Sequence, residues 1–392
     1  MNIIYIGAFR FPKYDAAAAR VLNNARALRA CGHNVVIISW GGKFEDPKIK
    51  AGDFDLYDGF RFTITGELDL KGGLVNKVKN RLNRGSKSMA ILKSTCNPDL
   101  IISYNPDLLF NLKLKNYASR YKINYANDIT EWSDNNELRM LERITNYFNL
   151  KHLTRHIDNR IVISSYLNNY YSSGNNVVVP PLCDVNETKW RQGYVKAKEK
   201  VGDFDGITLI YAGNPALKDA VHFAINAVQR LIDEGANIRF LIVGAERDLY
   251  QRNYTDLLTK KDLSDRIQFL GRVPQDEVPS YYALADFMVL LRESNRKSNA
   301  GFPTKFAESF ASSTPVIANL TSDLNRYLFE GNTGFVVEKP TEEAVYETLK
   351  TRVLGLSSDR IEQMKCNVKQ EAKRLDYHHY IEPLRRFVEN LQ

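Results

Sequence analysis

The chain has 392 residues, of which 44% are hydrophobic and 26% charged, a composition typical of a globular protein of about two domains. This composition excludes an intrinsically disordered chain, and the lack of any run of 18 apolar residues gives no transmembrane prediction. The formal net charge is +8, and residues 1–185 hold 25 Lys and Arg against 17 Asp and Glu. All the excess positive charge therefore lies in the N-terminal half, which predicts an acidic partner there.

The cysteines and the N-terminus indicate a compartment. The first residues have neither a basic segment nor a small-residue cleavage site, so we expect no signal peptide. The four cysteines are scattered and form no CxxC pair, which is typical of a reducing environment. The expected localisation is cytoplasmic, with peripheral attachment to the inner face of a membrane as an extension of that prediction.

Short β-branched runs alternate with helical patterns along the whole chain. In the first half we predict strands at residues 2–6, 34–39, 60–65, 100–103, 123–127, 160–164 and 176–180. In the second half we predict strands at residues 207–212, 239–243, 267–269, 287–290, 316–318 and 334–336. This alternation predicts the α/β class, with two doubly wound, Rossmann-like domains facing a cleft. The expected domains are residues 1–185 and 206–376, with a helix at 377–392 packing back on the first.

The predicted loop at residues 7–12 precedes an alanine-rich helix start. Arg10 and Arg20 are candidate acceptor-binding residues, because a guanidinium near a helix start can bind a phosphate. An ordinary alanine-rich helix start explains the same residues equally well.

Residues 70–98 carry positive charge without any negative charge. Leu74, Val78 and Leu82 recur every four residues, which predicts a short basic amphipathic helix suited to an anionic membrane surface. A solvated loop or a nucleic-acid contact remains open, but no nucleic-acid module supports the latter, so we expect no nucleic-acid partner. The basic residues are Lys71, Lys77, Lys79, Arg81, Arg84, Lys87 and Lys93.

Two carboxylates follow the predicted strand at 123–127. Ligands of parallel α/β sheets bind at the carboxyl ends of the strands. Asp128 and Glu131 are therefore candidate catalytic residues of the first domain.

Two loops of the second half have the composition of an anion site. Gly213 and Asn214 follow a strand and lead to Lys218, which we place in the first turn of the next helix. A second loop has the sequence ESNRKSNAGFPTKFAES, in which a helix should begin near Pro303. There the helix dipole, Arg296 and Lys305 favour an anion, and Glu308 lies one turn further on.

These motifs resemble the donor domain of GT-B-fold retaining glycosyltransferases of family 4. The resemblance covers most of residues 207–340 closely and the first half more loosely. It depends on the glycine-to-lysine loop at 213–218, the GRVP loop at 271–274, the GFPTKF segment and the following STPVIA segment. By that resemblance the donor-binding residues are Gly213, Asn214, Lys218, Arg272, Val273, Arg296, Gly301, Phe302, Pro303, Thr304, Lys305 and Glu308.

The sequence departs from the family pattern at three positions. Ala300 stands where the first Glu of the motif is usual, Pro303 replaces a glycine, and Asn214 replaces an arginine. These departures leave the donor sugar open, and Arg296 or Arg292 could supply the missing positive charge.

The resemblance implies a glycosyltransferase that acts with retention and without a metal. It would transfer a sugar from a nucleotide-diphosphate sugar, with UDP favoured, to a glycan or lipid-linked acceptor in surface polysaccharide assembly. Lys218 and Lys305 would stabilise the leaving diphosphate, and no cofactor beyond the nucleotide-sugar co-substrate is implied. Two alternatives remain: an epimerase or hydrolase of sugar nucleotides on the same fold, and a degenerate nucleotide-binding scaffold subunit.

Overall fold

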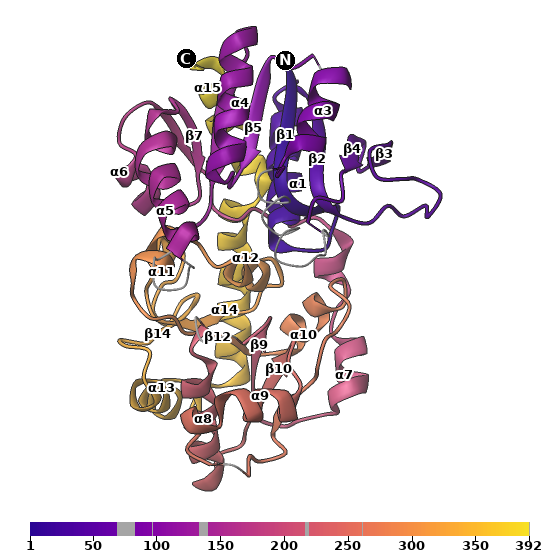
Figure 1. Cartoon of the computed structure of the whole chain (residues 1–392). Coiled ribbons are helices and arrows are strands. Elements are labelled where there is room, and N and C mark those ends of the chain that lie inside the picture. Colours follow the sequence, from indigo (N-terminus) through magenta and orange to yellow (C-terminus); the bar gives the residue numbers. More distant parts are fainter. Residues whose placement is uncertain (69–82, 96, 133–139, 216–218, 261, 392) are drawn as a thin grey trace. The chain divides into compact units, whose positions relative to one another are not determined.

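The computed structural model describes residues 1–68, 83–95, 97–132, 140–215, 219–260 and 262–391. The chain forms two compact units (Figure 1). Unit 1 comprises residues 1–182, 300–302 and 377–392, and unit 2 comprises residues 183–299 and 303–376. Within the described residues, no helix is long and apolar enough to cross a membrane.

Unit 1 contains an eight-stranded sheet in the order β3-β4-β2-β1-β5-β6-β7-β8. All neighbouring strands are parallel except β3, which pairs antiparallel with β4 at the edge of the sheet. The strands are β1 (Asn2–Phe11), β2 (Asn34–Gly42), β3 (Phe54–Tyr57), β4 (Phe60–Ile64), β5 (Leu100–Tyr104), β6 (Asn124–Ile129), β7 (Asn159–Val162) and β8 (Asn175–Val178).

Helices cover both faces of this sheet. On one face α1 (Ala16–Ala30) and the C-terminal α15 (Ile381–Glu389) pack on a core that includes Phe9 and Phe387. On the other, α3 (Ser86–Thr95) and α4 (Leu108–Tyr121) pack around Trp40 and Phe110. The remaining helical elements of the unit are α5 (Met140–Phe148), the π-helical η2 (Asn149–Leu153), the 3-10 helices η3 (Thr154–His156) and η10 (Tyr377–Tyr380), and α6 (Ser165–Tyr170).

Unit 2 contains six parallel strands in the order β11-β10-β9-β12-β13-β14. The strands are β9 (Ile207–Ala212), β10 (Ile238–Val243), β11 (Ile267–Phe269), β12 (Phe287–Leu290), β13 (Val316–Ala318) and β14 (Gly334–Val336). The helices are α7 (Val195–Val201), α8 (Val221–Asp233), α9 (Arg247–Tyr254), α10 (Val278–Leu284), α11 (Arg296–Ala300), α12 (Thr304–Ala311), α13 (Glu342–Thr348) and α14 (Ser358–Glu371). Shorter helical turns are η4 (Thr188–Arg191), η6 (Thr255–Leu257), η7 (Leu324–Arg326), η8 (Leu349–Val353) and η9 (Ala372–Leu375).

The predicted α/β class with two doubly wound units is confirmed, and five strands of unit 2 have the predicted ends. Two local features differ from the prediction. The first strand does not end at residue 6, because after Gly7 it bulges and continues to pair with β2 through Phe11. The edge strand β3 was not predicted, since it has only four residues, one of them an aspartate, and pairs with only one neighbour. Helix α8 begins at Val221, and the predicted helix opening at residues 213–219 includes residues 216–218, which lie outside the described residues.

Candidate functional site

The sheet of unit 2 has one point at which its strand order reverses, between β9 and β12. From β9 the chain builds outward to β10 and β11, whereas β12 begins the other half with β13 and β14. In open α/β sheets the crevice at such a point, at the carboxyl ends of the strands, is the usual ligand site. Both loops singled out in the sequence leave the sheet there.

A buried carboxylate, Asp219, lies at this edge of the sheet. Its Oδ2 accepts hydrogen bonds from Lys305 Nζ at 2.7 Å and from the Tyr211 hydroxyl at 2.7 Å. Its Oδ1 accepts from Arg292 Nε at 3.1 Å. Burial alone would raise the pKa of Asp219, but the Lys305 and Arg292 charges outweigh it and lower that pKa to about 2. Two cations around one carboxylate leave a net positive charge that suits an anionic ligand.

The two cations are held by different elements. Lys305 lies in the first turn of α12, and Arg292 follows β12. The backbone of Arg292 is fixed by Asn319, which accepts from the Arg292 N–H at 2.8 Å and donates to its carbonyl at 2.7 Å. The side chains of Lys305 and Arg292 are 15% and 13% exposed, so they are held at the edge of the core and not on a solvated face.

Gly213 allows the loop after β9 to lie close to Lys305 of α12. Its φ is +138°, and a Cβ at this position would lie 2.2 Å from Lys305 Cε. Only glycine fits both the conformation and the contact. Asn214 follows as an exposed residue, and its carbonyl accepts from the Tyr211 hydroxyl at 2.9 Å.

Glu308 lies one turn beyond Lys305 on α12 and is partly buried. Burial raises the pKa of Glu308, although the nearby Lys305 and Lys189 charges lower it. Within the part of the chain that the structure describes, the side-chain carboxylate of Glu308 has no hydrogen bond or ion pair. A carboxylate that is partly desolvated and unpaired is costly in a folded protein, and such groups are found where a ligand supplies the missing partners.

The other predicted donor residues lie at or near the same loops. Arg296 is exposed at the start of α11, and Arg272 is exposed after β11 with Val273 partly buried beside it. Of the residues before α12, Phe302 and Pro303 are buried, while Gly301 and Thr304 are partly exposed. Helix α12 begins one residue after Pro303, as predicted. Lys218 lies outside the described residues.

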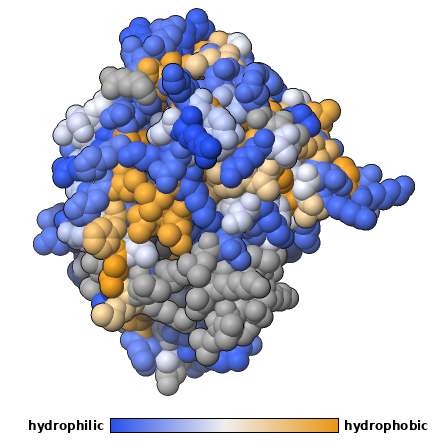
Figure 2. All heavy atoms as spheres, turned by 45° about the horizontal axis from the view of Figure 1, so that its top comes forward, coloured by the Kyte–Doolittle hydropathy of each residue, from blue (hydrophilic) through white to orange (hydrophobic). Residues whose placement is uncertain are grey.

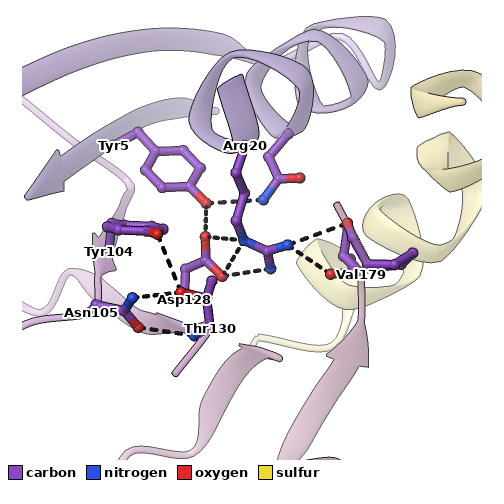
Figure 3. Close-up of polar contacts among 9 residues, drawn as sticks. Tyr5, Arg20, Tyr104, Asn105, Asp128, Thr130 and Val179 are labelled. Carbon is purple, nitrogen blue, oxygen red and sulfur yellow. Dashed lines mark hydrogen bonds and ion pairs between the residues drawn. The ribbon is translucent and has the colours of Figure 1, made fainter. Parts of the chain in front are cut away.

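In unit 1 two of the four predicted residues, Arg20 and Asp128, lie in one buried hydrogen-bond network (Figure 3). Arg20, which is 3% exposed, donates to Asp128 Oδ1 at 2.7 Å and to the Val179 carbonyl at 2.7 Å. Asp128 is fully buried and also accepts from the Tyr5 hydroxyl at 2.5 Å. This geometry corrects the expectation that Arg20 meets an acceptor phosphate, because its guanidinium is committed to the pair. We assign the pair the structural task of joining α1, β1, β6 and the backbone after β8.

The other two predicted residues of unit 1 lie at the surface. Arg10 is exposed at the end of β1 and forms a 3.7 Å ion pair with Asp15, the N-cap of α1. Glu131 is exposed two residues after β6. The predicted basic helix falls largely on residues 69–82, outside the described residues. Of its flanking cations, Arg84 pairs with Asp107 at 3.3 Å.

Asp219 and Tyr211 were not predicted from the sequence. Tyr211 reads as one more buried strand residue, and Asp219 reads as a solvated residue at the start of a helix. The only available signal was that Asp219 directly follows the candidate phosphate-binding Lys218.

Each unit is an α/β unit built on a largely parallel sheet, and the sheet of unit 2 has a cationic site where its strand order reverses. This combination defines the GT-B class of fold. Residues 206–353 match the family model described as "Glycosyl transferases group 1". Apart from residues 300–302, this match lies within unit 2, and it contains the Asp219 cluster and Glu308.

The chain is similar to several known proteins. A 143-residue segment is 27% identical to the alpha-D-kanosaminyltransferase of Streptomyces kanamyceticus, covering 36% of this chain and 34% of that protein. The aligned part thus spans about a third of this relative's length. The fold is similar to a sucrose-phosphate synthase from Thermosynechococcus elongatus (TM-score 0.74, 16% identity, covering 99% of this chain and 98% of that chain). It is also similar to Anabaena HepE in complex with UDP-glucose (TM-score 0.70, 12% identity, covering 100% of both chains).

Proposed function

We propose that this protein is a glycosyltransferase that binds a nucleotide-diphosphate sugar, with UDP favoured, in unit 2. The match of residues 206–353 to a glycosyltransferase family model and the similarity of the fold to a UDP-glucose complex support this proposal. The observation that carries it is Glu308, a partly buried carboxylate with a raised pKa and no hydrogen-bond partner among the described residues. The two vicinal hydroxyls of a sugar would supply the missing donors.

The diphosphate would lie against the cationic loops. Lys305 and Arg292 leave a net positive charge after pairing with Asp219, and Lys218 is the neighbour of Asp219 in the sequence. Positive groups held in place before the reaction stabilise the charge that grows on a leaving diphosphate without reorganising. On this proposal Lys305→Ala lowers turnover by about 10- to 1000-fold, the scale of losing one such group.

The finer part of the proposal concerns stereochemistry and the acceptor. Transfer would proceed with retention, the acceptor hydroxyl attacking on the face that the leaving diphosphate occupied and losing its proton to a phosphate oxygen. Fixed cations would serve in place of a metal ion, so turnover would be unchanged by a chelator. The acceptor would be a glycan or lipid-linked molecule in surface polysaccharide assembly. Glu131, which is exposed in unit 1, remains our prediction for a catalytic residue. Arg10 remains our prediction for acceptor contact, and residues 70–98 for membrane contact.

A thermal-shift experiment tests the donor site. UDP, GDP and ADP, with and without a sugar, are added to the wild-type protein and to Glu308→Gln. We expect one diphosphate to raise the melting temperature of the wild type, since a ligand of the native state stabilises it by mass action. Glu308→Gln should abolish or strongly reduce the additional shift that the sugar-bearing ligand produces.

Two controls separate binding from folding. Glu347→Gln changes an exposed carboxylate on α13 of the same unit and should respond to ligand as the wild type does. Because the folded pKa of Glu308 is raised, any stability it contributes is present at acid pH and lost as the pH rises. Glu308→Gln should therefore be at least as stable as the wild type at pH 7, and a lost response cannot be assigned to unfolding. A wild-type protein that responds to no nucleotide contradicts the proposal.

A further inference from the structure

Helices on one face of the sheet in unit 1 carry almost only positive charge. The segments α3, α4 and residues 140–156 contain one acidic residue, Glu142. Their basic residues are Lys87, Lys93, Lys113, Lys115, Arg120, Arg143, Lys151 and Arg155. By contrast, α15 on the opposite face combines Arg385 and Arg386 with Glu382 and Glu389. The α3–α4 side of the sheet is therefore strongly positive.

An exposed apolar stripe runs along α5 on this side. Met140, Ile144 and Phe148 recur at every fourth residue and so lie on one side of the helix. They are 79%, 45% and 50% exposed. Tyr147 beside them is 41% exposed. Four large apolar side chains left in water on a single short helix indicate a surface that is covered in function.

The stripe continues into a shallow groove between α4 and the turns η2 and η3. The groove has a volume of about 400 Å³, and Phe148 of the stripe lies in its wall. Its apolar lining includes Leu108, Leu112 and Leu153, and Lys115 lies in the wall beside them. Leu112 is itself 37% exposed. The apolar surface therefore extends from α5 onto α4.

Cations border the apolar side chains directly. Lys151 Nζ lies 4.7 Å from the centre of the Tyr147 ring, and Lys115 Nζ donates to the His156 carbonyl at 3.4 Å. Such side chains can lay their methylene stems on apolar surface while the charge stays in a polar layer. On the face of the molecule that Figure 2 draws, hydrophobic residues gather next to hydrophilic ones.

We propose that this surface, the α4–α5 patch, docks on an anionic phospholipid membrane. The patch comprises the apolar Leu112, Met140, Ile144, Tyr147 and Phe148 and the cations Lys115 and Lys151. A helix with an apolar side and basic neighbours binds in the interfacial plane of a bilayer, where the apolar groups enter the acyl boundary and the cations meet the headgroups.

Charge argues against the other occupants of this surface. A symmetric contact between two copies through the patch would bring the same cations face to face, which is unfavourable. A nucleic acid would satisfy the cations but leave Met140 and Ile144 without an apolar environment. An anionic membrane satisfies both groups. The patch shares no residue with the segment 70–98, so the two predictions can be tested with different variants.

Vesicle co-sedimentation of the full chain tests the proposal. Vesicles of phosphatidylglycerol mixed with phosphatidylcholine are compared with vesicles of phosphatidylcholine alone, at low and high salt. The test variant is Ile144→Asp/Phe148→Asp. The matched control is Leu56→Asp, which introduces the same charge at a leucine of unit 1 that is 69% exposed and lies on β3.

We expect the wild type and Leu56→Asp to bind the anionic vesicles, with binding that weakens in high salt. The double variant should bind at least about tenfold more weakly, since losing the burial of one large apolar side chain alone has that effect. Its melting temperature should match that of the wild type, because both replaced side chains are half exposed.

Three results would overturn the inference. The first is a wild-type protein that does not sediment with anionic vesicles, and the second is a double variant that binds as the wild type does. The third is a wild-type dimer in light scattering that the double variant converts to a monomer, which would assign the patch to a second copy. A Lys115→Glu/Lys151→Glu variant keeps the apolar stripe and should lose binding to anionic vesicles, so it tests the electrostatic half separately.

Discussion

At the scale of single residues, the main finding is that a buried aspartate organises the cations of the candidate donor site. Lys305 and Glu308 could be selected from the sequence because they follow a recognisable loop. Asp219 could not, because its partners Arg292 and Lys305 lie 73 and 86 positions away along the chain. The function of a carboxylate depends on the charged groups beside it, and Lys305 and Arg292 lie beside Asp219 only in the folded unit.

Replacement of Asp219 should destabilise the protein in a pH-dependent way. The folded pKa of about 2 lies below the ordinary value of 3.8, so the ionised carboxylate stabilises the fold above pH 4, and this contribution is lost as the pH falls toward 2. We expect Asp219→Asn to lower the free energy of unfolding by about 2–3 kcal/mol at pH 7. In urea titrations, the difference in the free energy of unfolding between the wild type and Asp219→Asn should be constant from pH 7 to pH 5. It should become smaller below pH 4.

The control for this prediction is Asp265→Asn, since Asp265 is an exposed aspartate of the same unit. Its free energy of unfolding should stay within about 0.5 kcal/mol of the wild type. Equal stability of the Asp219 and Asp265 variants would show that the cation cluster does not depend on Asp219.

At the scale of elements, the strand-loop-helix unit from β9 to α8 depends on one glycine. Continuous apolar runs such as Ile207–Ala212 predicted the parallel strands because strands covered on both faces have no alternating pattern. Helix α8 begins at Val221, and the contact between Asp219 and Lys305 lies two residues before that start. Helix propensity alone does not predict this tertiary contact.

Substitution of Gly213 should disturb the site through this contact. An alanine Cβ would lie 2.2 Å from Lys305 Cε, so the Lys305 side chain must shift from its position beside Asp219. We expect Gly213→Ala to reduce stability by about 1–3 kcal/mol and to weaken diphosphate binding in calorimetric titrations. Gly235→Ala is the matched control: its φ of +88° is also strained for alanine, but no atom lies within 4 Å of the added Cβ. It should lose stability and bind diphosphate normally. Unchanged binding by both variants would contradict the assignment.

At the scale of the whole molecule, the chain ends in the unit in which it began. Residues 377–392 belong to unit 1, and α15 packs on the same core as α1. Phe387 is 2% exposed in that core. The amphipathic pattern of these last residues had predicted a helix that packs on the first domain.

Phe387→Ala should therefore unfold unit 1 more easily, by about 3–5 kcal/mol, the usual cost of truncating a buried phenylalanine. Two of the three tryptophans, Trp40 and Trp132, lie in unit 1, and Trp190 lies in unit 2. A Trp190→Phe background thus makes tryptophan fluorescence a probe of unit 1 during urea unfolding. Phe329→Ala, at a phenylalanine of unit 2 that is 38% exposed, should leave this transition unchanged.

The sequence by itself determined the fold class, nearly all the strands and the two loops of the candidate donor site. These features depend on local patterns: apolar runs of strand length, glycine after a strand and proline before a helix. Only the tertiary structure decided which charged residues face a ligand and which satisfy one another. Arg20 was a candidate for contact with the acceptor and Asp128 a candidate catalytic residue, but folding pairs these two residues, 108 positions apart, in the core. The α4–α5 patch likewise arises only when two helices with unremarkable sequences pack side by side, because exposure is a property of packing and not of composition.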